Sequence, residues 1–314
     1  MRSLLPTMEL LAPAKINLCL YLGGRRLDGL HRLVSLFEPA GPVDRLRVER
    51  GGEPAPATGE PVGGGEGGAA DRVVGMETEG DNTVLRALRV LRAAGWRSPP
   101  VTVRIEKRIP VGAGLGGGSA DAAAVLRWAT KGAGRSDELD PAELGALVGA
   151  DVPSQIEPAF TLVGGAGEEL EALPEPVPHA VLLLTDGGGL STAAVFAEAD
   201  RLGLGRDESE LDRRTAELRE ATVAGNSPLE YTELLTNDLE AAAFALRPDL
   251  ADSVEELRLA GAAHAAMTGS GSTVFGLFAD LDSAERAAAR LNRPGTLACR
   301  AGADPSVPKP GAAA

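Results

Sequence analysis

A glycine-rich stretch in the first half of the chain has the composition of an anion-binding loop. Residues 110–121 read PVGAGLGGGSAD, and the apolar run AAAVL follows at once. Glycine allows a ligand to approach the backbone closely, and a helix that begins after the loop points free N–H groups and its positive dipole end at the ligand. The sequence therefore predicts a phosphate site, and ATP is the commonest phosphorylated ligand.

The stretch differs from the two best-known phosphate-binding motifs. The P-loop pattern needs a Lys after its glycines, and none is present here. The dinucleotide fingerprint fits loosely at Gly112, Gly114 and Gly117, with a strand expected just before, but Pro110 and the run of three glycines do not suit it. A flexible turn is the structural alternative.

Three stretches, taken together, resemble the GHMP kinases, a superfamily that includes galactokinase, homoserine kinase and mevalonate kinase. Residues 12–18 (APAKINL) resemble its first motif, and residues 112–119 its second, which wraps the ATP phosphates. Residues 267–276 (MTGSGSTVFG) resemble its third. Three motifs in order are far more specific than any one of them.

Four stretches narrow the resemblance to the family of 4-diphosphocytidyl-2-C-methyl-D-erythritol kinases of the non-mevalonate isoprenoid pathway. They are residues 13–18, residues 28–31 (DGLH) with Leu36-Phe37 soon after, residues 149–153 (GADVP) and residues 237–240 (NDLE). The resemblance runs from about residue 8 to residue 280. It implies ATP-dependent phosphorylation of that compound's 2-hydroxyl, with Mg²⁺ arriving with ATP.

Two ionisable residues are the catalytic candidates. Asp151 follows an apolar helix, where an unpaired carboxylate is costly to bury, and the resemblance makes it the base that takes the proton of the substrate hydroxyl. Lys15 sits within an apolar strand, an unusual place for Lys, and a cation there can hold a carboxylate ionised. The structural alternatives are a turn aspartate and a strand-edge lysine that reaches solvent.

The substrate side is assigned mainly by resemblance. Asn17 shares a strand face with Lys15, and His31 matches a residue that contacts the cytidine base. The third motif supplies Gly269, Ser270 and Gly271. Two departures fall here: Leu30 stands where the family carries a Tyr that stacks on cytosine, and residues 154–156 (SQI) replace common aromatic residues.

The nucleotide side combines the loop with two residues outside it. By resemblance, Asn82 and Lys107 line the adenine pocket. Ser119 is a candidate phosphate or Mg²⁺ ligand, with a plain helix N-cap as its alternative. The ATP-binding set is Asn82, Lys107, Pro110, Gly112, Ala113, Gly114, Leu115, Gly116, Gly117, Gly118, Ser119 and Ala120.

Two other functions remain open from the sequence. One is a GHMP kinase for a different small alcohol, such as homoserine or a mevalonate derivative, which the departures at Leu30 and Ser154 allow. The other is a non-catalytic ATP-binding relative, against which the presence of both Lys15 and Asp151 argues.

The composition of the chain argues against several classes of binding partner. The net charge of −14 argues against nonspecific nucleic-acid binding, and no apolar run approaches the length of a membrane span. Cys19 and Cys299 do not form a disulfide framework or a metal site. No signal peptide is convincing, so we expect a cytoplasmic location. We expect a monomer or homodimer, and Met8 is a plausible alternative start.

Periodicity and capping signals predict an α+β protein, with mostly antiparallel sheets covered by helices. The strands are expected between 8 and 48 and at 101–105, 180–185, 263–268, 273–278 and 296–300. The helices are expected at 84–94, 120–130, 141–148, 191–202, 208–222, 229–246, 249–260 and 282–291.

Two domains are expected at this length. Residues 174–178 (PEPVP) resemble a linker, so we expect an ATP-binding domain at 1–173, a second domain at 174–314 and an active site between them. Residues 50–72 are rich in Gly, Pro and Ala and predict a flexible insertion, and the tail from Ala301 is expected to be loose.

Overall fold

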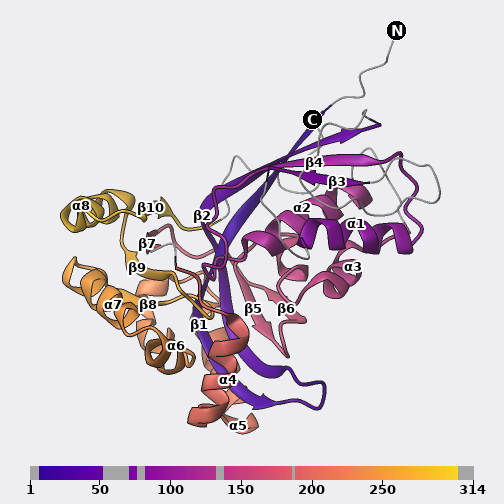
Figure 1. The fold of residues 1–314 in the computed structure, drawn as a ribbon. Helices are drawn as coiled ribbons and strands as arrows, with labels where there is room; N and C mark the ends of the chain where they lie inside the picture. The colour runs from indigo at the N-terminus through magenta and orange to yellow at the C-terminus, as the bar shows by residue number, and fades with distance from the viewer. Residues whose placement is uncertain (1–6, 52–70, 76–81, 132–137, 186–187, 303–314) are drawn as a thin grey trace. The chain divides into compact units, whose positions relative to one another are not determined.

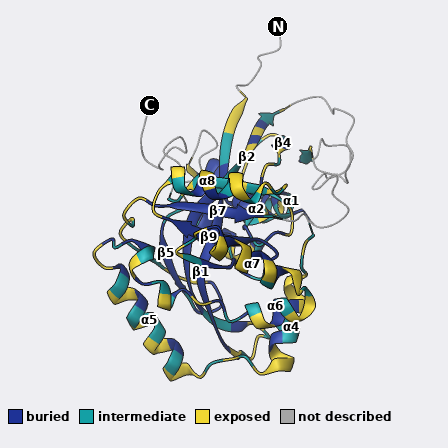
Figure 2. Ribbon diagram, turned by 90° about the vertical axis from the view of Figure 1, so that its left-hand side faces the viewer, coloured by how far each residue is buried: buried dark blue, intermediate teal, exposed yellow. Residues whose placement is uncertain are grey.

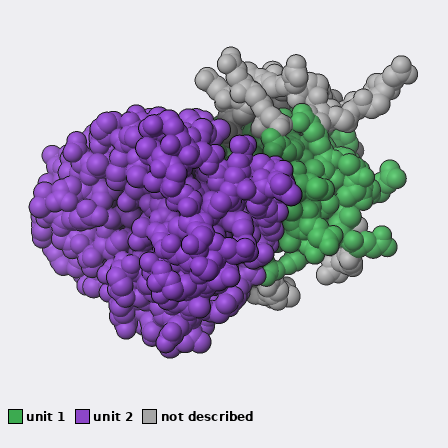
Figure 3. Space-filling model, turned by 90° about the horizontal axis from the view of Figure 1, so that it is seen from below, with its two compact units in different colours: residues 1–13, 42–109, 117–157 green, residues 14–41, 110–116, 158–314 purple. Residues whose placement is uncertain are grey.

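The computed structural model describes residues 7–51, 71–75, 82–131, 138–185 and 188–302 (Figure 1). These residues form two compact units, shown in different colours in Figure 3. Unit 1 contains residues 1–13, 42–109 and 117–157, and unit 2 contains residues 14–41, 110–116 and 158–314. Each unit is therefore built from separated stretches of chain. The domain boundary that the sequence analysis places between residues 173 and 174 stays a prediction.

The secondary structure alternates between strands and helices along the chain. The strands are β1 (Met8–Arg25), β2 (His31–Arg50), β3 (Arg72–Val74), β4 (Val101–Glu106), β5 (Thr161–Gly164), β6 (Glu169–Ala172), β7 (Ala180–Leu184), β8 (His264–Met267), β9 (Val274–Phe278) and β10 (Thr296–Arg300). The α-helices are α1 (Thr83–Ala93), α2 (Gly117–Lys131), α3 (Pro141–Val148), α4 (Thr192–Leu202), α5 (Glu208–Thr222), α6 (Glu240–Leu246), α7 (Asp249–Leu259) and α8 (Leu281–Leu291). The 3₁₀ turns are η1 (Pro153–Gln155), η2 (Pro228–Glu230) and η3 (Thr232–Leu234).

Unit 1 packs three helices on a small sheet. The second half of β2 pairs antiparallel with β4, and β4 pairs parallel with β3. The helices α1, α2 and α3 bury their apolar faces in one core cluster with these strands, in which Trp96 meets Trp128 edge to face at 5.6 Å. The alanine-rich sequence of α2 suits this position, because residues 122–126 are all buried and small side chains let neighbouring elements approach.

Local capping signals set where two of these helices begin. The Asn82 side chain accepts hydrogen bonds from the N–H groups of Val84 and Leu85 at the start of α1. The Asp140 side chain does the same for Ala142 at the start of α3, where Pro141 takes the first helical position. Asn and Asp are favoured N-cap residues, and Pro is favoured at the first helical position, so residue type accounts for both helix starts.

Unit 2 contains the first half of β2 with β5 and β6, and a separate four-stranded antiparallel sheet. This second sheet has the order β10-β7-β9-β8. Its central strands β7 and β9 are buried along their whole length (Figure 2). The helices α4, α6, α7 and α8 contribute to one core cluster with this sheet. The α+β prediction is confirmed, and β3 with β4 is the one parallel pair among the registered strand pairings of the described residues.

The helix expected at 229–246 is wrong. The segment forms the turns η2 and η3, a short link, and then the short helix α6. In the link, Asn237 forms an isolated bridge with Leu20 of β1, where the Leu20 N–H donates to the Thr236 carbonyl and the Leu20 carbonyl accepts from the Asp238 N–H. A local pattern cannot show that a distant strand takes these donors and acceptors.

Parts of two other expectations lie outside the described residues. Of the insertion expected at 50–72, residues 52–70 are not described, whereas Arg50 ends β2 and Arg72 begins β3. Of the expected tail, residues 303–314 are not described, and Ala301 still donates to the carbonyl of His179. Both cysteines are free, with Cys19 buried and Cys299 half-buried.

The side chain of His264 on β8 makes stability depend on pH. Burial lowers its pKa to about 4, below the ordinary value near 6.5. Between these two values the unfolded chain binds a proton that the folded chain rejects, so the free energy of unfolding falls as the pH drops from 6.5 to 4. The expected loss is about 3 kcal/mol. Urea unfolding of the wild type and His264→Gln across this range measures it, and equal pH slopes in the two proteins would contradict the expectation.

Candidate active site

Strand β1 places Lys15 and Asn17 next to each other on one buried face. The Lys15 Nζ donates a hydrogen bond of 2.6 Å to the Asn17 Oδ1, and both side chains are almost fully buried. The same ammonium group lies 4.2 Å from the centre of the Phe37 ring on β2. Asn17 in turn donates to the hydroxyl of Ser35, at 2.9 Å. The ammonium group is therefore held in place by an amide and an aromatic ring within the strands themselves.

The glycine loop, residues 110–116, lies directly against this part of β1. The backbone N–H of Lys15 donates to the carbonyl of Leu115 at 3.1 Å. A Cβ atom on Gly116 would stand 3.1 Å from the aliphatic carbons of Lys15, and Gly116 has a positive φ of 69°. Glycine is needed at this position for two reasons. It adopts the positive φ without strain, and it leaves room for the aliphatic carbons of the Lys15 side chain.

The third-motif loop, residues 267–273, packs against the glycine loop. Thr273 donates to the carbonyl of Ala113 at 3.1 Å. A Cβ on Gly114 would lie 2.7 Å from the carbonyl oxygen of Thr268 and 2.9 Å from that of Gly271. The two loops therefore touch backbone to backbone, and the three motifs separated in sequence meet within unit 2.

The third-motif loop also contacts Asn17. The hydroxyl of Thr268 accepts from the Asn17 N–H at 2.8 Å, and a Cβ on Gly269 would lie 3.1 Å from the Asn17 Oδ1. Ser270 shares a hydrogen bond of 2.9 Å with Thr192 at the start of α4. These contacts bring the expected substrate residues Asn17, Gly269 and Ser270 together, with Gly271 next in the chain.

The segment at residues 237–240, identified only by resemblance, holds the third-motif loop. The Asn237 amide donates to the carbonyls of Met267 and Gly269, at 2.7 and 2.9 Å. The Glu240 carboxylate accepts from the Met267 N–H at 2.7 Å, and burial raises the pKa of Glu240. Both side chains form hydrogen bonds with backbone groups of the third-motif loop and so fix its conformation.

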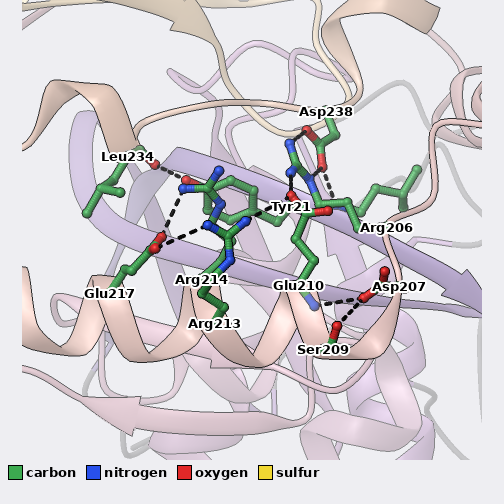
Figure 4. A network of polar contacts seen from close by, with 11 residues as sticks. Tyr21, Arg206, Asp207, Ser209, Glu210, Arg213, Arg214, Glu217, Leu234 and Asp238 are labelled. Carbon is green, nitrogen blue, oxygen red and sulfur yellow. Dashed lines mark hydrogen bonds and ion pairs between the residues drawn. The ribbon is translucent and has the colours of Figure 1, made fainter.

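Asp238 in the same segment anchors a polar network around Tyr21 (Figure 4). Its carboxylate accepts from the backbone of Leu22 and receives two hydrogen bonds from Arg206, at 2.6 and 2.7 Å. The guanidinium groups of Arg206 and Arg214 lie 5.1 and 5.3 Å from the centre of the Tyr21 ring. Hydrogen bonding to Asp238 raises the pKa of Arg206, so the Arg206 guanidinium stays charged. The network ties β1 to the helical part of unit 2.

His31, at the start of β2, lies in a contact with helix α4 that sequence reasoning missed. Its Nε2 is 2.7 Å from the Asp200 Oδ1, and its ring centre is 5.2 Å from that of Phe196. Neither α4 residue stood out in the sequence, because no motif marks them. His31 is buried, whereas the neighbouring Leu30 is 52% exposed. Leu30 therefore presents an open apolar surface beside a buried imidazole.

In unit 1, helix α2 begins three residues earlier than expected. Gly117, Gly118, Ser119 and Ala120 form its first turn, so Ser119 lies inside the helix and is not its N-cap. Thr83 donates to the carbonyl of Gly118 at 2.8 Å. The first turn carries no acidic side chain, which leaves the positive end of the helix dipole available to an anion.

Lys107 lies beside this turn in an ion-pair cluster. A Cβ on Gly117 would be 3.2 Å from its Nζ. The ammonium group bonds the buried carboxylate of Asp44 and, at 2.9 Å, that of Asp121. Burial raises the pKa of Asp121 to about 7, and the nearby Lys107 opposes the rise. Lys107 thus supports α2, and Asn82 caps α1; their expected contact with adenine stays a prediction.

Asp151 lies in a tightly held turn between α3 and η1 of unit 1. The hydroxyl of Ser154 donates to the Asp151 carbonyl at 2.8 Å. Arg86 donates to the carbonyl of Val148 before the turn, and Arg127 donates to those of Gln155 and Ile156 after it. The turn is therefore fixed on both sides by arginines from α1 and α2. Gln155, within the departure from the family pattern noted at residues 154–156, is buried.

Within the described ranges, no group of three or more His, Cys, Asp and Glu side chains is arranged to hold a metal ion. None of the helices in those ranges has the length and apolar character needed to cross a bilayer.

Comparison with known proteins defines the class. The model "GHMP kinases N terminal domain" matches residues 82–165, and "GHMP kinases C terminal" matches residues 214–297. The chain shares the fold of L. major mevalonate kinase, with a TM-score of 0.64 at 13% identity over 96% of this chain and 99% of that one.

Closer relatives give the family. A 4-diphosphocytidyl-2-C-methyl-D-erythritol kinase of Methylobacterium radiotolerans is 41% identical over 89% of this chain and 92% of its own length. One from Thermobifida fusca is 38% identical over 94% and 95%. A crystal structure of 4-(cytidine 5'-diphospho)-2C-methyl-D-erythritol kinase has a TM-score of 0.72 at 34% identity, covering 95% of this chain and all of that one. The chain belongs to the 4-diphosphocytidyl-2-C-methyl-D-erythritol kinase family of GHMP kinases.

Proposed function

We propose that this ATP-dependent kinase phosphorylates the 2-hydroxyl of 4-diphosphocytidyl-2-C-methyl-D-erythritol. The observation that carries the proposal is the assembly in unit 2, where the Lys15–Asn17 pair, the glycine loop and the third-motif loop lie against one another. These are the stretches that match the kinase motifs in the sequence. The relatives at 41% and 38% identity carry the same name over nearly the whole chain.

In the proposed reaction, Asp151 accepts the proton of the substrate hydroxyl. The hydroxyl oxygen forms a bond to the γ-phosphorus of ATP as the bond to the β–γ bridging oxygen breaks, and ADP leaves. Lys15 supplies the fixed positive charge that favours an ionised hydroxyl at the moment of transfer. Asn17 holds the Lys15 ammonium in place, which keeps that charge aimed in one direction.

The residues present fit a bound triphosphate. The glycine loop presents backbone at positions where side chains are absent, and the first turn of α2 carries no carboxylate that would repel an anion. Mg²⁺, bound to the triphosphate, would neutralise charge on the transferring phosphoryl group, and the Ser119 hydroxyl is the proposed protein ligand near it. The cytoplasmic location and the choice between monomer and homodimer stay predictions from the sequence.

Steady-state release of ADP tests the proposal. Purified protein with Mg-ATP is expected to turn over 4-diphosphocytidyl-2-C-methyl-D-erythritol and to leave homoserine and mevalonate unphosphorylated. Turnover of one of those alcohols instead would move the assignment to another GHMP kinase activity. ATP binding without turnover of any alcohol would point to a non-catalytic relative.

A further inference from the structure

A chain of hydrogen bonds between β1 and β2 leads from a backbone carbonyl to the Lys15 ammonium group. The Ser35 hydroxyl donates to the carbonyl of Cys19 at 2.5 Å, and the Asn17 Nδ2 donates to the same hydroxyl at 2.9 Å. The Asn17 Oδ1 then accepts from the Lys15 Nζ at 2.6 Å. Ser35 has no exposed surface, and Asn17 and Lys15 are only 3% and 4% exposed, so bulk water does not compete for these contacts.

The Cys19 carbonyl sets the direction of this chain of hydrogen bonds. A carbonyl oxygen only accepts, so the single proton of the Ser35 hydroxyl is used there. Toward Asn17 the hydroxyl can then only accept, which requires the amide to present its NH₂ group to Ser35 and its oxygen to Lys15. The ammonium group, which only donates, therefore meets the acceptor end of the amide. Ser35 selects the amide orientation that suits Lys15.

The rest of the Lys15 side chain is confined by two other neighbours. Ser35 and Phe37 are two residues apart on β2 and so share a face of the strand. The centre of the Phe37 ring is 4.2 Å from the Lys15 Nζ. The aliphatic carbons of Lys15 lie against Gly116, where an added Cβ would be 3.1 Å away. With the stem confined in this way, the place of the charged end depends on the amide that Ser35 orients.

We propose that Ser35 is a positioning residue for phosphoryl transfer, whose hydroxyl fixes the place of the Lys15 ammonium group through the Asn17 amide. This inference rests on the proposed function, in which Lys15 supplies a fixed positive charge that favours an ionised substrate hydroxyl. Ser35 is fully buried and acts through Asn17, so it touches neither substrate.

The loss of the Ser35 hydroxyl would reach Lys15 by way of the amide. The Asn17 NH₂ and the Cys19 carbonyl would each lose a buried partner, and leaving a buried polar group unpaired is costly, so the amide shifts toward another acceptor. The ammonium group moves with the amide oxygen to which it donates. Because electrostatic stabilisation depends on charges held in place before the reaction, a displaced ammonium group slows the transfer step.

Steady-state kinetics of Ser35→Ala tests the proposal. For the cytidine-linked alcohol, kcat is expected to fall about tenfold, since misplacement of a positioning group by about 1 Å can cost about 100-fold and Phe37 still restrains Lys15. KM for ATP and for the alcohol is expected to stay within about twofold, because Ser35 contacts neither. Ser35→Thr keeps the hydroxyl and is expected to restore kcat to within about threefold of wild type.

Ser253→Ala is the matched control. The Ser253 hydroxyl on α7 is also buried, donates to a backbone carbonyl, that of Asp249, and accepts from a side chain, that of Arg293. It is not part of the chain that ends at Lys15, so kcat is expected to stay within about twofold of wild type. Equal losses of kcat in Ser35→Ala and Ser253→Ala, or a loss that Ser35→Thr does not restore, would overturn the proposal.

Nitrogen NMR of the lysine side chains follows the ammonium group directly and needs no substrate. The Nζ signal of Lys15 is the one that disappears in Lys15→Arg, and few signals compete with it, because the other lysines of the sequence are Lys107, Lys131 and Lys309. The Lys15 signal is expected to move in Ser35→Ala and to stay in place in Ser253→Ala. An identical Lys15 signal in wild type and Ser35→Ala would contradict the proposal.

The outcomes separate this inference from the proposed function. Wild-type turnover of the cytidine-linked alcohol, with kcat or the Lys15 signal unchanged in Ser35→Ala, overturns the role of Ser35 alone. A wild-type protein that binds ATP but does not turn over this alcohol overturns the proposed function, and the kinetic role of Ser35 with it, whatever the NMR signals show.

Discussion

Asp151→Asn is expected to lower kcat about 10³-fold, within the range found when a general base is removed. The change removes the proton acceptor but keeps the size and shape of the side chain. The turn should survive, because Ser154 bonds the backbone carbonyl of Asp151 and arginines from α1 and α2 hold the neighbouring carbonyls. The loss is therefore expected in kcat, measured as ADP release at saturating substrates, with ATP binding retained.

Asp140→Asn is the matched control for this prediction. Asp140 lies at the other end of α3, where it caps the helix by accepting from Ala142. Asparagine caps helices as well as aspartate does, so kcat and stability should stay close to wild type. An Asp151→Asn variant that keeps more than about a tenth of wild-type kcat would rule out Asp151 as the general base.

Gly114→Ala is expected to lower kcat/KM for ATP about 100-fold, because misplacement of a positioning group by about 1 Å can cost that much. A Cβ at this position would meet two backbone oxygens of the third-motif loop at 2.7 and 2.9 Å, and neither can swing away as a flexible side chain would. Gly114 also has a φ of 78°, which alanine adopts only with strain. The glycine loop must therefore move away from the loop it packs against.

A glycine outside the motifs separates this clash from backbone strain. Gly203, at the end of α4 and far along the chain from the motifs, has a φ of 67° and nothing within 4 Å. Alanine at this position should cost about 1–2 kcal/mol of strain. If Gly203→Ala, which lies outside the ATP-binding set, loses as much kcat/KM for ATP as Gly114→Ala does, contact between the loops is not the cause.

The site could be predicted from the sequence only where neighbouring residues carry the signal. The Lys15–Asn17 pair follows from a strand period of two, and the helix caps at Asn82 and Asp140 follow from residue type. By contrast, the partners of His31 lie 165 and 169 positions away on α4, and no local pattern connects them. The sequence could not predict the hydrogen-bond partners of three further residues either, because those partners lie on other elements: Asn237, Asp238 and Glu240.

The sequence by itself determined the family, the α+β class and most helices and strands, because motif spacing, capping residues and apolar periodicity act over a few residues at a time. Tertiary structure alone decided that Thr236 and Asp238 hydrogen-bond to Leu20 of β1, that the first glycines of α2 are helical and that Lys107 is bound by two carboxylates. In each case a backbone or charged group takes a partner from a distant element. The free energy of that pairing outweighs the weak local preference that the sequence displays.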